Sequence, residues 1–109
     1  MASSALIYKI FRPDEWAAFE AAGRFDGSAD DRRDGFIHFS KADQLRGTLG
    51  RYYADEDRVA IAAFPAERFD DRLKWEASRD GQLFPHLYAP LLMAQLESVE
   101  WIEPKAGTG

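Results

Sequence analysis

The apolar residues of this chain come in short runs, and this pattern limits the fold more than any other feature of the sequence. Even the run from Arg58 to Phe64 (RVAIAAF) falls far short of the roughly 18–20 residues that span a bilayer. With 109 residues, the chain is long enough for one compact domain and too short for two. We therefore predict a single domain over residues 1–109, with loose ends at 1–4 and 104–109.

Charge and cysteine content exclude several classes of function. The net charge of −5 argues against binding DNA through bulk charge. The sequence has no cysteine, which rules out disulfides, thiolate nucleophiles and cysteine-ligated metal sites. The first residues lack a basic segment followed by a long apolar one, as a signal peptide would have. We expect a cytoplasmic protein that does not bind membranes.

The first third of the chain predicts a strand, a helix and a loop. Ala5 to Phe11 (ALIYKIF) is typical of a strand, in which Lys9 would be a cation in the middle of an otherwise apolar face. Pro13 to Ala22 predicts a short helix, because proline suits the first turn and Gly23 the residue after the end. Arg24 to Gly35 is polar and rich in Gly and Asp, which predicts a surface loop.

A second strand and helix are predicted next. Phe36 to Phe39 (FIHF) is short and apolar, and the segment SKAD at residues 40–43 fits a capping box that starts a helix. Apolar residues at helical spacing continue this helix to about Tyr53. Gly47 and Gly50 lie inside it, and each costs about 1 kcal/mol relative to alanine.

The remaining chain predicts further strands. Arg58 to Phe64 is typical of a central strand buried on both faces. Leu73 to Ser78 alternates, with Trp75 and Ala77 expected toward the core, and Asp80-Gly81 predicts a turn. Proline at position 85 places the extended segment 83–88 at an edge or a bulge, and residues 99–102 predict a last strand. The total of about five or six short strands and two main helices indicates an α+β domain.

The two histidines are the first candidates for chemistry. His38 lies in GFIHFS and His86 in LFPHLY. A histidine on a short strand is more often a hydrogen-bonded structural residue than a catalyst. The alternative is that the strand ending in His-x-Ser presents an imidazole, a hydroxyl and free backbone N–H groups to an anion at the start of the helix. Asp43 opposes an anion there, and capping alone explains Ser40.

Glu76 in LKWEAS is the best candidate for a working carboxylate. A solvated strand residue is the usual role of such a glutamate. If its face lines a cleft with Lys9 and the two histidines, it could act as a general base or accept a ribose hydroxyl. Tyr88 and Trp75 could offer a stacking surface, although aromatic residues at these spacings more often belong to the core.

Other site classes have weaker support. A metal-dependent hydrolase using His38, His86 and Glu76 is conceivable, but no local ligand spacing favours it and we assign no metal ligands. The sequence contains no G-x-S-x-G elbow, no P-loop and no G-x-G-x-x-G, so the usual serine hydrolase, mononucleotide and dinucleotide signatures are missing.

Several segments in order carry a resemblance to a known family. IYKIF, GFIHFS, the apolar strand, LKWEAS and FPHLYAPL resemble an uncharacterised bacterial family catalogued as domain of unknown function nine hundred and fifty-two. The resemblance covers residues 6–92. It implies a fold similar to that of ADP-ribosyltransferases, which bind NAD in a cleft between two small sheets. IHFS also resembles the His-x-Ser strand of the RNA 2′-phosphotransferases of that group.

The resemblance implies roles for particular residues. His38 and Ser40 would lie beside a ribose of the cofactor, whereas Glu76, His86 and Tyr88 belong to motifs of the family itself. Many relatives have histidine where this chain has Lys9. A lysine keeps the donor and the positive charge for phosphate but cannot accept a proton as imidazole does. The candidate catalytic residues are His38, Glu76 and His86, and the candidate cofactor-binding residues are Lys9, His38, Ser40 and Tyr88.

We expect a nucleotide- or NAD-binding domain with an ADP-ribosyltransferase-like fold. Its reaction, if it has one, would be transfer of or onto an ADP-ribosyl group or an RNA 2′-phosphate, with NAD as the cofactor and a small-molecule nucleotide as the partner. The alternative is a non-catalytic module on the same scaffold that binds a small metabolite or a protein. In that case His38 and His86 are structural and Lys9 marks a lost catalytic position.

Overall fold

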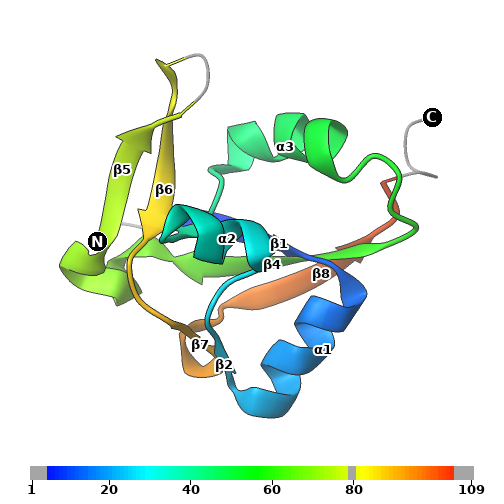
Figure 1. The fold of residues 1–109 in the computed structure, drawn as a ribbon, viewed down its shortest axis with the longest axis horizontal. Coiled ribbons are helices and arrows are strands. Elements are labelled where there is room, and N and C mark those ends of the chain that lie inside the picture. The colour runs from blue at the N-terminus through cyan, green and yellow to red at the C-terminus, as the bar shows by residue number, and fades with distance from the viewer. Residues whose placement is uncertain (1–4, 79–80, 105–109) are drawn as a thin grey trace.

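The computed structural model describes residues 5–78 and 81–104 (Figure 1). The predicted loose ends at 1–4 and 104–109, apart from Pro104, and Asp80 of the predicted turn lie outside these residues. The α-helices are α1 (Pro13–Ala22), α2 (Ala29–Asp34) and α3 (Leu45–Tyr52). The strands are β1 (Leu6–Phe11), β2 (Arg24–Phe25), β3 (Ile37–His38), β4 (Val59–Pro65), β5 (Leu73–Ala77), β6 (Leu83–Leu87), β7 (Leu91–Leu92) and β8 (Ser98–Ile102). Short 3₁₀ turns are Ala42–Gln44, Ala66–Arg72 and Met93–Gln95.

The fold class is α+β, as predicted, and the described strands form two three-stranded sheets and one two-stranded ribbon. The first sheet has the order β1-β4-β8, the second β3-β6-β5, and the ribbon pairs β2 with β7. All pairs are antiparallel. Helix α1 lies on one side of the first sheet and α3 on the other, while the β5–β6 hairpin stands beside them (Figure 1). The predicted central, doubly buried strand is β4.

An aromatic cluster joins α1 to the first sheet. Phe11 and Phe19 are fully buried, and their rings stack with centroids 5.4 Å apart. Trp16 and Phe25 meet Phe11 edge to face at 5.3 and 5.0 Å. Burial of each such side chain stabilises the fold by about 1.5–3 kcal/mol. Lys9 lies on the same sheet face between two fully buried residues, Ile7 and Phe11, as the sequence predicts.

The segment predicted as a surface loop, Arg24 to Gly35, instead contains strand β2 and helix α2. Two of its polar residues begin helix α2, because Ser28 and Asp31 form a reciprocal capping box at its N-terminus. The Ser28 Oγ accepts the Asp31 N–H at 3.1 Å, and an Asp31 carboxylate oxygen accepts the Ser28 N–H at 2.9 Å. Gly35 ends the helix in the left-handed conformation, with φ of 90°. Composition therefore misled the prediction, since serine and aspartate serve caps as readily as loops.

Ser40 does not cap the following helix. It forms an isolated bridge with Tyr8 of β1, with two backbone hydrogen bonds of 2.8 Å. The turn that leads into α3 starts one residue later, at Lys41, whose N–H donates to the Gln44 side chain at 2.9 Å. Pairing with β1 thus outweighs the local capping signal. It also fixes the end of the β3 segment against the first sheet.

Three predictions for the hairpin are wrong. Strand β6 is the centre of its sheet rather than an edge, and Pro85 is tolerated because its missing N–H faces the point where the two-residue β3 has ended. The Pro85 carbonyl still accepts the Phe39 N–H at 3.0 Å. Trp75 is 41% exposed and Ala77 is also exposed, so neither lies in the core. Figure 1 shows one end of the β5–β6 hairpin extending past the body of the domain. Leu73 of the same hairpin is buried, as the alternation predicts.

Candidate functional site

A cleft of about 410 Å³ lies between α2, α3, β1 and the β3–β6 pair. Four of the predicted site residues line it, namely Lys9, His38, Ser40 and His86. Residues that were not predicted also line it, from the end of β1 and from α2, α3 and their flanks: Arg12, Asp31, Asp34, Phe36, Thr48, Tyr52 and Tyr53. The two candidate histidines therefore meet at one cavity, although they are far apart in the sequence.

Asp31 is the centre of the polar network at the floor of this cleft. The residue is only 3% exposed. One carboxylate oxygen accepts hydrogen bonds from the Lys9 ammonium at 2.9 Å and the Ser28 N–H at 2.9 Å. The other contacts the His38 Nδ1 at 2.6 Å and accepts the His38 N–H at 3.2 Å. Burial raises the pKa of the Asp31 carboxyl, but the bonds from His38 and Lys9 outweigh it and hold that pKa well below its usual range.

Lys9 is buried and paired within this network, whereas the sequence suggested that it could contact a ligand phosphate. It is 5% exposed, and its ammonium lies 2.9 Å from Asp31 and 5.8 Å from the centre of the Phe25 ring. A cation buried on an apolar face needs a partner of opposite charge to be stable there. Asp31 is that partner. The apolar setting of Lys9 was the sequence signal that a buried carboxylate had to exist.

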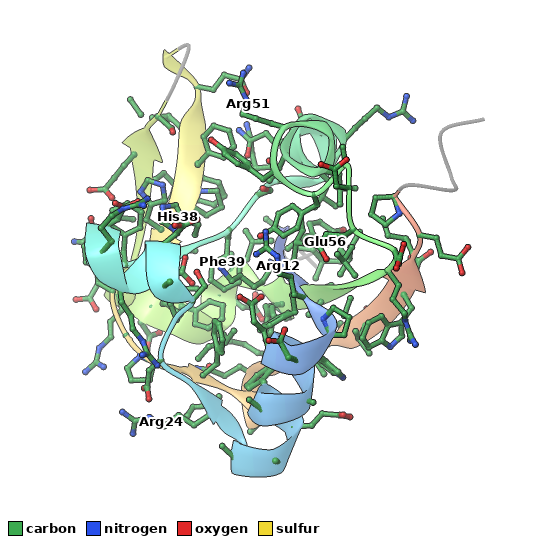
Figure 2. The ribbon with its side chains drawn as sticks, turned by 45° about the vertical axis from the view of Figure 1, so that its right-hand side comes forward. Arg12, Arg24, His38, Phe39, Arg51 and Glu56 are labelled. Atoms are coloured by element: carbon green, nitrogen blue, oxygen red, sulfur yellow. The ribbon has the colours of Figure 1, made fainter. Side chains whose placement is uncertain are left out.

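His38 lies between two carboxylates of α2. Its Nδ1 contacts Asp31, and its Nε2 lies 2.9 Å from the Oδ2 of Asp34. Only the protonated ring can donate at both nitrogens. A hydrogen bond from Arg33, supported by the Arg33 and His38 charges, lowers the pKa of Asp34. The His38 side chain is 38% exposed and lies beside α2 and the hairpin (Figure 2).

His86 is held by a carboxylate from the hairpin. Its Nδ1 lies 2.8 Å from Oε1 of Glu76, and the same oxygen accepts the Tyr88 hydroxyl at 2.7 Å. The bond from Tyr88, followed by that from His86, lowers the pKa of Glu76, and the bond to Glu76 raises the pKa of Tyr88. His86 is buried, whereas the Glu76 side chain is 42% exposed. Glu76 and Tyr88 thus reach the cleft only through His86.

The two imidazoles are adjacent. His38 and His86 are register partners in the β3–β6 pair, and their ring centres lie 5.7 Å apart. The Phe36 ring stacks on His86 at 3.9 Å and lies 4.6 Å from His38. The aromatic ring limits how far either imidazole can turn. Two oriented imidazoles therefore share one face of the second sheet.

The other end of the cleft combines charge, aromatic rings and hydroxyls. The Arg12 Nε donates to Glu56 at 2.9 Å, and its guanidinium lies 4.7 Å from the centre of the Tyr53 ring (Figure 2). Burial raises the pKa of Tyr53 to about 12. The Ser40 and Thr48 hydroxyls are 3.2 Å apart. This end offers stacking and hydrogen-bonding groups near one another.

The lining residues that sequence reasoning missed include the charged residues Asp31, Asp34 and Arg12. The Ser-x-x-Asp spacing at residues 28–31 is a helix-start signal that could have placed the two aspartates on a helix. No local pattern pointed to Arg12, since its role depends on Glu56 and Tyr53. Within residues 5–78 and 81–104, no group of three or more His, Asp or Glu side chains could hold a metal ion. No helix of that part of the chain is long and apolar enough to cross a membrane.

Comparisons with known proteins give a family and a solved relative. The family described as Protein of unknown function (DUF952) matches residues 10–99, which include both GFIHFS and FPHLYAPL. The crystal structure of protein CC0527 from Caulobacter crescentus is 45% identical, with a TM-score of 0.84 over 87% of this chain and 83% of that one. The solution NMR structure of CC0527 gives a TM-score of 0.79 over 87% and 82% of the two chains. No curated protein matches significantly.

Proposed function

The chain belongs to the DUF952 family, and we propose that its cleft binds a nucleotide such as NAD or ADP-ribose on an ADP-ribosyltransferase-like scaffold. One observation carries the proposal: the imidazoles of His38 and His86 lie side by side in a cleft of about 410 Å³. Small-molecule sites in proteins span roughly 300–1,000 Å³, so the cavity suits a ligand of this class.

The lining groups support a nucleoside in particular. Phe36, Tyr52 and Tyr53 offer aromatic surface for a base, and the hydroxyls of Ser40 and Thr48 suit a ribose. In this proposal His38 and Ser40 contact the ribose, as the family resemblance implies. Lys9 then contributes charge from beneath Asp31 rather than a direct contact, because it is almost fully buried.

The reaction proposed for the cleft is transfer of or onto an ADP-ribosyl group or an RNA 2′-phosphate. NAD would supply the ADP-ribosyl group, and the chain would bind and orient it. Glu76 holds the Nδ1 of His86 at 2.8 Å, and Tyr88 steadies Glu76 from the other side. These two residues would fix the imidazole that meets the ribose or the attacking group.

A non-catalytic module is the second candidate, and one observation favours it. Each cation around the cleft already faces a carboxylate of this chain: Lys9 faces Asp31, Arg12 faces Glu56, and Arg33 faces Asp30 and Asp34. A diphosphate would have to replace these partners. A neutral metabolite would not.

A thermal-shift titration with NAD, ADP-ribose and AMP tests the proposal. A ligand at about 100 times its dissociation constant adds roughly 2.7 kcal/mol, which shifts the melting temperature of a domain this size by several degrees. We expect a shift for the wild type and for Glu100→Gln, an exposed residue of β8 away from the cleft, and none for His38→Ala. No shift with any of the three at millimolar concentration would refute nucleotide binding in favour of the non-catalytic module.

A further inference from the structure

We propose that His38 and His86 act as a general acid and a general base on one phosphorus atom, and that the substrate is a ribonucleoside 2′,3′-cyclic phosphate. The inference rests on the proposed nucleotide binding and names its substrate class. The donor and acceptor roles follow from what each ring nitrogen contacts. The substrate class follows from the charge balance of the cleft.

His86 is arranged as the proton acceptor. Glu76 is an acceptor at 2.8 Å from Nδ1, so Nδ1 carries a hydrogen, and in the neutral ring the lone pair is then on Nε2. Among the described residues, none hydrogen-bonds this Nε2. Tyr88 bonds to the same Glu76 oxygen and keeps the carboxylate in place. His86 thus has one nitrogen held and one nitrogen open to a ligand.

His38 is arranged as the proton donor. Both of its nitrogens lie within 3 Å of carboxylate oxygens, Asp31 at 2.6 Å and Asp34 at 2.9 Å, so a protonated ring faces an acceptor at each nitrogen. Asp31 is buried and fixed by Lys9, whereas the Asp34 side chain is 35% exposed. A substrate oxygen can therefore replace Asp34 at Nε2 while Asp31 keeps the ring oriented.

The chemistry of the leaving group makes a phosphate ester a second substrate class of the nucleotide site, beside NAD. Cleaving a P–O bond expels an alkoxide, which needs a proton, whereas nicotinamide leaves NAD as a neutral ring without one. A donor imidazole beside an acceptor imidazole is therefore matched to the phosphate ester. Because Lys9, Arg12 and Arg33 already face carboxylates of the chain, a singly charged phosphodiester has to displace fewer of these pairs than a diphosphate does.

The step balances with water as the co-reactant. The water oxygen forms a bond to phosphorus, and its proton passes to Nε2 of His86. The bond between phosphorus and O2′ breaks, and O2′ takes the proton from Nε2 of His38. The product is a nucleoside 3′-monophosphate, and proton exchange with solvent restores both rings. Ring centres 5.7 Å apart on adjacent strands are close enough for both groups to reach a single phosphoryl group.

Hydrolysis of 2′,3′-cyclic AMP by the full-length chain tests the inference, with 3′-AMP as the product followed by chromatography. Loss of either the acid or the base lowers a rate by about 10²–10⁴-fold, and we expect this for His38→Gln and His86→Gln. Glu100→Gln should keep the wild-type rate. Wild-type protein that forms no 3′-AMP, or that keeps its rate in both histidine variants, would overturn the inference.

Two further variants remain informative if a histidine variant does not fold. Asp34→Asn removes the exposed competitor at His38, so we expect KM to fall by about two- to five-fold. Glu76→Leu removes the acceptor that orients His86, and its pH–rate profile should lose the limb that reports the base. Glu76→Gln, whose amide oxygen still accepts the Nδ1–H, should keep most of the rate. The charged groups facing the pair in that profile are Asp31, Asp34, Glu76 and Lys74. A KM unchanged in Asp34→Asn together with an unchanged profile in Glu76→Leu would contradict the assigned roles.

The thermal-shift titration separates nucleotide binding from hydrolysis by the two histidines. If AMP stabilises the protein and 2′,3′-cyclic AMP is not hydrolysed, the acid–base pair is refuted and nucleotide binding stands. If neither AMP, NAD nor ADP-ribose stabilises the protein and no hydrolysis occurs, both fail. Stabilisation by AMP together with hydrolysis that depends on both histidines supports both.

Discussion

The two histidines of the cleft are each held at Nδ1 by a carboxylate, but the two carboxylates lie in very different surroundings. Asp31 is buried and hydrogen-bonded to Lys9, Ser28 and His38, while the side chain of Glu76, on a hairpin strand, is 42% exposed. The bond between a carboxylate and the Nδ1 of an imidazole is therefore buried at Asp31 and close to the surface at Glu76. We expect a substitution of Asp31 to lower the stability of the fold, and a substitution of Glu76 to alter mainly the orientation and reactivity of His86.

Asp31→Asn should give the largest effect. It leaves the Lys9 ammonium buried without a counter-charge, and breaking one partner of a buried ion pair costs about 3–5 kcal/mol. Thermal melts should show a fall in melting temperature of about 10 °C or more. Asp34→Asn, on the same helix but exposed, is the matched control and should melt close to the wild type. Equal melting of the two variants would mean that burial does not distinguish the two aspartates.

Removing both partners of the buried pair should restore part of this loss. Lys9→Met leaves a buried carboxylate with less compensation, whereas Lys9→Met combined with Asp31→Leu leaves no buried charge in the pair. Urea denaturation should therefore show that the double variant is more stable than the sum of the single losses predicts, by about 0.5–3 kcal/mol. Strictly additive losses would contradict a direct ion pair.

The buried network should make stability depend on pH in the acid range. The folded pKa of Asp31 lies below its unfolded value of about 3.9, so its contribution is present above that value and is lost as the pH falls toward the folded pKa. Urea denaturation between pH 3 and pH 7 should show stability falling below about pH 4. In Asp31→Asn the curve should be flatter in the same range. A wild-type curve as flat as that of the variant would rule out this assignment.

Tyr88→Phe should give the smallest effect, because Tyr88 contacts Glu76, the more exposed of the two carboxylates. The Tyr88 hydroxyl is the main cause of the lowered pKa of Glu76, so its removal should move that pKa up toward the ordinary range for glutamate. The melting temperature should stay close to the wild type, because both side chains are exposed. An NMR titration of the Glu76 carboxyl measures the shift. A pKa that does not move would show that His86 alone sets it.

The sequence predicts the helices and strands of this fold well, but it predicts the tertiary contacts between distant segments poorly. Periodicity places α1 at its observed bounds and β4 as the central strand, because apolar spacing and end signals agree there. The segment 24–35 was misassigned because its serine and aspartates serve a helix cap, and Ser40 because pairing with Tyr8 overrides capping. Local composition cannot weigh a tertiary partner against a local one.

The site shows the same division. His38, His86 and Ser40 were found from their own short motifs, and the cleft does contain them. Asp31 was missed because its importance comes from Lys9, which lies 22 positions away in the chain. Only the fold brings a carboxylate of α2 to the ammonium of β1. The buried lysine was nevertheless a usable signal that such a carboxylate existed.

The central claim is that two carboxylate-held imidazoles face one nucleotide-binding cleft, and an NMR titration of the imidazole nitrogens with AMP tests it most directly. Uniform ¹⁵N labelling resolves both rings, since the chain has only two histidines. We predict that AMP shifts the Nε2 signals of His38 and His86 together, with one saturation curve. The Nδ1 signals should stay unchanged, because the Nδ1 atoms remain bonded to Asp31 and Glu76. Signals of both rings that do not respond to saturating AMP would contradict the account.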